Sequence, residues 1–189
     1  TYNNIITARL TMIYRILPLI LFCVFSFKPL NVIESTKNKI NATDPKLIAA
    51  NIKATFEAKA KLCFNVIDAN GFSLPTFDSF IAAFEGYELL KQQGKIQNEI
   101  LTIVDFSLSS TQERMWVIDM KNQKVLLKSL VAHGRNSGLE YAKDFSNTNE
   151  SFKSSLGFYI TGETYTGKHG LSLRLDGMEY GINDNARNR

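Results

Sequence analysis

The sequence predicts an α+β fold in which a short helical region precedes a mainly β domain. Two observations predict it. Apolar side chains recur every three or four residues between positions 44 and 94, and β-branched, alternating and glycine-rich segments follow from residue 95 onward. The 189 residues are 44% hydrophobic and 11% aromatic, enough for one ordinary domain and a targeting segment. Disordered and collagen-like classes are therefore excluded.

Charge and rare residue types exclude further classes of function. Lys and Arg number 22 against 18 Asp and Glu, and this net charge of +4 is too small to predict nucleic-acid binding. The two cysteines, Cys23 and Cys63, exclude a disulfide scaffold or a multi-cysteine zinc site. His133 and His169 are the only histidines, so the sequence lacks an ordinary set of metal ligands and predicts no metal site.

The N-terminal segment is predicted to direct export. Ten of the twelve residues in 16–27 are apolar, Arg15 precedes them and Lys28 follows. A helix needs about 20 apolar residues to span a bilayer, so this shorter run is typical of a secretory signal. We assign residues 1–27 to a signal peptide or membrane anchor, with Met12 as the expected start and membrane contact through this segment only. A buried core helix is the alternative, and no clear cleavage site is present. Residues 28–43 are polar and form a linker.

Residues 44–94 are predicted to form two helices. Asp44 precedes Pro45 as an N-cap, and Ile48, Ile52 and Phe56 then place apolar side chains on one helix face as far as about residue 62. A second helix follows residue 75 and ends near Gly94. Its apolar stripe, which we assign to the core, comprises Phe77, Phe80, Ile81, Phe84 and Tyr87.

Residues 95–189 are predicted to be mainly β. The β-branched run 100–106 suits a buried strand, and segments 114–119 and 124–131 are expected to flank a hairpin turn. A further strand is expected at 156–161. Segment 171–176 alternates cleanly between apolar and polar residues, which predicts that its leucines (Leu171, Leu173 and Leu175) face the core.

Two polar loops are the candidate binding sites. The first contains His133, Arg135, Asn136 and Ser137. It is either a rim that orients a carboxylate-bearing substrate through the forked guanidinium of Arg135, or a turn whose polar side chains cap their own backbone.

The second loop, residues 165–170, contains Tyr165 and His169 but lacks the glycine spacing of a phosphate-binding loop. It is either a hairpin loop or a second substrate contact. Cys63 follows a predicted helix, where the dipole disfavours a thiolate, so we assign it to the core.

From residue 101 onward the chain contains, in this order, the strings LTIVDFSLSS, RMWVID, LVAHGRNSG, SSLGFY, TGETY, GKHG, SLRLDG and GINDNA. This series resembles the bacterial, Bacteroidetes-type murein L,D-transpeptidase catalytic domain family. The resemblance covers residues 75–189 approximately.

This resemblance implies an exported periplasmic or cell-envelope enzyme that acts on the peptide stems of peptidoglycan. In the family, a cysteine thiolate attacks the carbonyl of the diamino acid and releases the terminal D-alanine, and an amine of a neighbouring stem then resolves the acyl-enzyme. Backbone donors stabilise the oxyanion, and no cofactor is needed. The residues of the two polar loops that match family strings are expected near the substrate cleft.

The sequence departs from the family pattern at the catalytic residues. The family histidine lies in a His-Gly motif and its nucleophile in a Ser-x-Gly-Cys motif, both of which follow the GINDNA string. Neither motif is found after that string: His133 and His169 lie before it and do not match the catalytic histidine's motif, and Cys63 does not match the nucleophile. The resemblance therefore implies a domain that is incomplete at the C-terminus, with its nucleophile beyond Arg189. The chain alone is then expected to be inactive. An L,D-carboxypeptidase of the same family and a non-catalytic peptidoglycan-binding remnant are the alternatives.

Overall fold

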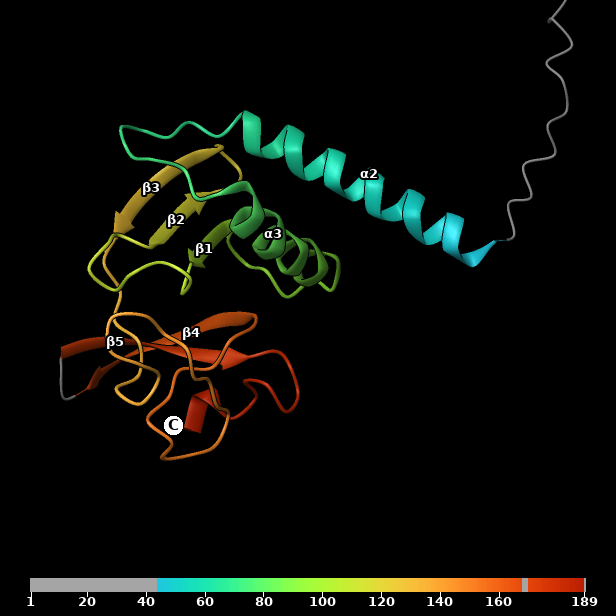
Figure 1. Ribbon diagram of the computed structural model, residues 1–189. Helices are drawn as coiled ribbons and strands as arrows, with labels where there is room; N and C mark the ends of the chain where they lie inside the picture. The colour runs from blue at the N-terminus through green and yellow to red at the C-terminus, as the bar shows by residue number, and fades with distance from the viewer. Residues whose placement is uncertain (1–43, 168–169, 189) are drawn as a thin grey trace, which may run out of the picture. The chain divides into compact units, whose positions relative to one another are not determined.

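The structure, a computed structural model, describes residues 44–167 and 170–188 (Figure 1). The predicted signal segment 1–27, the start at Met12, the linker 28–43 and His169 lie outside the described residues. The chain divides into two units, of which the second, Pro45–Arg189, holds all the described helices and strands. Two helices precede two antiparallel sheets in this unit, which confirms the α+β prediction.

The first helices are α2 (Pro45–Asn65) and α3 (Phe77–Gln92). The Thr76 hydroxyl caps α3 by accepting a hydrogen bond from the Ser79 backbone N–H at 3.2 Å. Gly94 follows the helix with a φ of 68°, a conformation that glycine adopts without steric cost. Phe80, Phe84 and Tyr87 of the predicted α3 stripe are buried, and Phe77 and Ile81 are half-buried against them. Phe80 and Phe84 stack at 5.4 Å between ring centroids.

The apolar face predicted for α2 is only partly buried. Phe56 packs against the core and stacks on Phe84, whereas Ile48 and Ile52 are 45% and 65% exposed. In Figure 1 the C-terminal half of α2 lies beside α3 and its N-terminal half extends past it. Four-residue periodicity identifies the face, but the length of the neighbouring helix decides how much of that face is covered.

Strands β1 (Ile100–Val104), β2 (Met115–Asp119) and β3 (Lys124–Ser129) form an antiparallel sheet in that order. Alternate residues of β1 and β2 are buried, among them Ile103, Trp116 and Ile118. These side chains pack with the aromatic residues of α3 into one hydrophobic core. The Trp116 indole N–H also donates to the Ser73 carbonyl oxygen at 2.8 Å.

Strands β4 (Tyr159–Gly167) and β5 (Gly170–Gly177) form a separate two-stranded antiparallel sheet with a bulge between Thr161 and Thr164. The prediction that the β5 leucines face the core is wrong, since Leu171, Leu173 and Leu175 are 80%, 46% and 42% exposed. The 3-10 helix η1 (Ala186–Asn188) packs on β5, where Arg187 pairs with Asp176 rather than with any leucine of the strand. Alternation shows that the two faces of a strand differ, but a neighbouring element decides which face is covered.

Candidate functional site

Gly134 and Ser137 hold the first candidate loop against Ser154. The Gly134 backbone N–H donates to the Ser154 hydroxyl at 2.9 Å, and the Ser154 backbone N–H donates to the Ser137 hydroxyl at 2.8 Å. A Cβ atom on Gly134 would lie 2.4 Å from the Phe152 carbonyl oxygen, so only glycine permits this approach. Ser137 is fully buried where the two segments meet.

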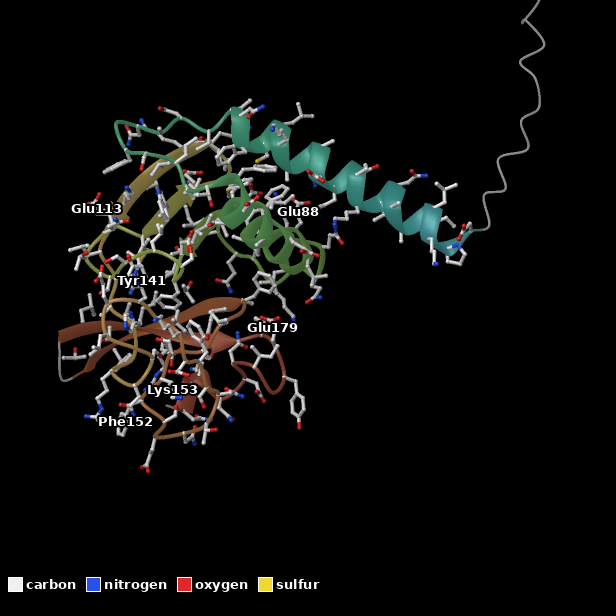
Figure 2. The ribbon with its side chains drawn as sticks, viewed as in Figure 1. Glu88, Glu113, Tyr141, Phe152, Lys153 and Glu179 are labelled. Atoms are coloured by element: carbon white, nitrogen blue, oxygen red, sulfur yellow. The ribbon has the colours of Figure 1, made fainter. Side chains whose placement is uncertain are left out.

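Asn136 adds a second set of bonds between the same segments. Its backbone N–H donates to the Phe152 carbonyl oxygen at 3.1 Å, and its side-chain amide donates to the Ser151 carbonyl oxygen at 2.9 Å. Residues 133–138 and 151–154 are therefore held together as one unit, which we call the loop pair. Figure 2 shows Phe152 and Lys153 on the loop that leads into β4.

A buried arginine anchors the start of the loop pair. Arg114 is fully buried immediately before β2, and its guanidinium donates to the carbonyl oxygens of Val131 and Leu108 at 2.8–3.2 Å. Its Nη2 also lies 2.8 Å from His133 Nδ1. A guanidinium has donors only, so His133 Nδ1 accepts and the ring proton is assigned to Nε2, which donates to the Gly138 carbonyl oxygen at 3.2 Å. Both ring nitrogens of His133 are thus engaged.

Arg135 points away from this network. The residue is exposed, and the central carbon of its guanidinium lies 3.7 Å from the centroid of the Phe152 ring. This distance places the cation in contact with the face of the ring. Within the described residues, no carboxylate lies at ion-pair distance from Arg135.

Tyr165 lies on β4, apart from the loop pair. It is 41% exposed, and the Arg174 guanidinium covers its ring at 4.5 Å. Arg174 also pairs with Glu163 at 3.3 Å, which places Tyr165 beside an ion-pair network on this sheet. In the part of the chain that the structure describes, no hydrogen bond or ring contact joins Tyr165 to the loop pair.

Cys63 lies on the last turns of α2 and is half-buried against the core. Burial raises the pKa of its thiol, and the nearby Glu88 carboxylate adds to this shift against the opposing charge of Lys59. A raised pKa leaves less thiolate at neutral pH, which disfavours a nucleophilic role. Residues 44–167 and 170–188 hold no cluster of three or more His, Cys, Asp or Glu suited to a metal ion.

Two residues of this site, Arg114 and Phe152, are not predicted from the sequence. Arg114 directly precedes β2, where an arginine ordinarily reaches solvent, and nothing in its local pattern signals burial. Phe152 stands alone in a polar stretch with no periodic partner. The only sequence signal for Phe152 is that it is an aromatic residue in a polar loop, and this signal does not identify Arg135 as its partner.

No curated protein and no solved structure matches the chain. Among the described residues, no helix has the length and apolar character needed to cross a membrane. The family model described as the L,D-transpeptidase catalytic domain matches residues 73–189, which include α3, both sheets and the loop pair. The chain therefore belongs to the L,D-transpeptidase catalytic domain family.

Proposed function

We propose that this protein takes part in acyl transfer between peptide stems of peptidoglycan, with a cysteine nucleophile in sequence that follows Arg189. The family match over residues 73–189 carries the proposal. The cysteine of a Ser-x-Gly-Cys motif would form the acyl-enzyme and a stem amine would resolve it. We further propose export to the cell envelope through the segment 1–27, because the substrate lies outside the cytoplasm.

The loop pair supports the proposed binding of a stem. Its backbone is fixed by hydrogen bonds between the two segments and by the buried Arg114, so the exposed side chains on it extend from a backbone that is ordered before any ligand arrives. Preorganisation of this kind lowers the entropic cost of binding. We propose that His133, Arg135, Asn136 and Ser137 line or support the stem site. Tyr165, on β4, and His169 are proposed as further contacts to the stem.

The properties of Cys63 support a nucleophile located elsewhere. Its raised pKa and its position against the core oppose thiolate attack on a bulky stem. The described part of the chain provides no histidine beside it. The 189 residues also contain no Ser-x-Gly-Cys string.

The test begins with the coding sequence past Arg189, which should continue through His-Gly and Ser-x-Gly-Cys. The continued chain should transfer a stem acyl group to a diamino-acid acceptor, and a matched variant with alanine in place of the motif cysteine should not. Mass spectrometry then separates cross-linked dimers from trimmed stems, which identifies a transpeptidase or a carboxypeptidase. Activity in the alanine variant, or a stop codon after Arg189 with sacculus binding only, would contradict the proposal.

A further inference from the structure

Arg135 differs from the other arginines in the described part of the chain by having no protein acceptor. Arg187 pairs with Asp176 and Glu163, and Arg174 pairs with the same Glu163. Arg114 is buried and donates to carbonyl oxygens. Arg135 is exposed, and no hydrogen bond or ion pair within residues 44–167 and 170–188 uses its N–H groups. Its donors are therefore available to a ligand.

Phe152 holds a backbone conformation that is unfavourable for a bulky residue. Its φ is 54°, in the left-handed region, and its side chain is 53% exposed. Burial of the ring is thus too small to account for the strained backbone. Its prominent contact is the face-on approach of the Arg135 guanidinium at 3.7 Å. Strain at an exposed residue is often found where function requires a fixed geometry.

The stacked ring restricts how Arg135 can bind. One face of the guanidinium is covered by Phe152, and the planar edges that carry the N–H groups remain open. These edges present two parallel donors, the geometry that matches a carboxylate. The Asn136 backbone N–H donates to the Phe152 carbonyl oxygen at 3.1 Å. This bond joins the backbone segments that carry the Arg135 cation and the Phe152 ring.

We propose that Phe152 is a positioning residue for Arg135, and that the stacked pair binds the C-terminal carboxylate of a peptide stem. This inference rests on the proposed function, since it names the stem group that the loop pair recognises. The Arg135 guanidinium donates two hydrogen bonds to the carboxylate. Phe152 orients the guanidinium and does not itself contact the carboxylate.

The test uses the 189-residue chain and two synthetic stem tetrapeptides that end in the diamino acid and D-alanine. One has a free C-terminal carboxylate and the other a C-terminal amide. Calorimetric titration should show about tenfold tighter binding of the free acid, as expected for a charge-assisted hydrogen-bonded pair. Phe152→Leu and Phe152→Gly should lower this preference about two- to fivefold, the size of an exposed cation–π contact. Phe152→Tyr should retain it.

The glycine variant separates positioning from folding. Glycine relieves the left-handed backbone strain, so the melting temperature of Phe152→Gly should not fall below that of the unaltered chain while its preference for the acid falls. Equal binding of acid and amide by the unaltered chain, or an unchanged preference in Phe152→Leu and Phe152→Gly, would overturn the inference alone. Binding of neither peptide would contradict the proposed stem site and this inference together.

Discussion

At the scale of single residues, the site depends on a buried cation and a nearby carboxylate. Arg114 is fully buried, and burial lowers the pKa of its guanidinium. The negative charge of Asp105 opposes part of this shift. Burial alone would raise the pKa of Asp105, but hydrogen bonds from Ser107 and Ser79 outweigh this effect and lower it. Asp105 therefore stays ionised at neutral pH. Its charge offsets part of the cost of burying the arginine that orients His133.

Cys63 leads to a prediction at the same scale. Because burial raises its thiol pKa, the thiolate fraction at pH 7–8 lies below that of an ordinary cysteine. In a Cys23→Ser background, we expect iodoacetamide to alkylate Cys63 more slowly than a free cysteine, with the rate rising only at more alkaline pH. Mass spectrometry of timed samples measures it, with the same chain in urea as the control. Rapid alkylation of the folded chain at pH 7 would show that Cys63 is activated.

At the scale of elements, helix α3 is fitted closely to the segment before β4. Gly86 lies on α3, and a Cβ atom there would lie 2.2 Å from the Phe158 ring. The Phe158 backbone is fixed because its N–H donates to the Glu179 carboxylate at 2.7 Å and its carbonyl oxygen accepts from Met178 and Asn183. Glu179, labelled in Figure 2, thus helps to hold the Phe158 backbone beside the helix.

Gly86→Ala tests this contact. Alanine in a helix is ordinarily more stable than glycine by about 1 kcal/mol. Here the overlap with Phe158 should reverse the sign, so we expect a net loss of about 1–3 kcal/mol in the free energy of unfolding. Urea denaturation measures the change. In a Phe158→Ala background the same substitution should stabilise, and a stabilising effect without that second change would refute the close fit.

At the scale of the whole molecule, the two sheets differ in how their apolar residues are covered. The β1–β2–β3 sheet shares a buried core with α3, which includes Ile103, Trp116 and Ile118. The β4–β5 sheet is covered by η1 on its charged face, and its leucines remain exposed in the described chain. Stability should therefore come mainly from the first sheet and its helices.

Matched leucine substitutions measure this difference. Leu101 on β1 is 9% exposed and Leu171 on β5 is 80% exposed. We expect Leu101→Ala to lower the free energy of unfolding by about 2–5 kcal/mol, because it leaves a cavity. Leu171→Ala should change it by less than about 0.5 kcal/mol. A loss above about 2 kcal/mol for Leu171→Ala in urea denaturation would mean that the β5 leucines are covered in solution.

The sequence by itself determined the fold class, the α3 stripe, the hairpin around residues 120–123 and, through its ordered strings, the family. These features follow from local periodicity, turn chemistry and motif order, which are present in the chain before it folds. Only the tertiary structure decided which faces are covered, as the exposed Ile52 and Leu171 show. It alone also revealed the buried Arg114 and the Phe152 ring beneath Arg135. The contacts of Arg114 with Val131 and His133, and of Arg135 with Phe152, join residues 17 or more positions apart, and no local pattern encodes them.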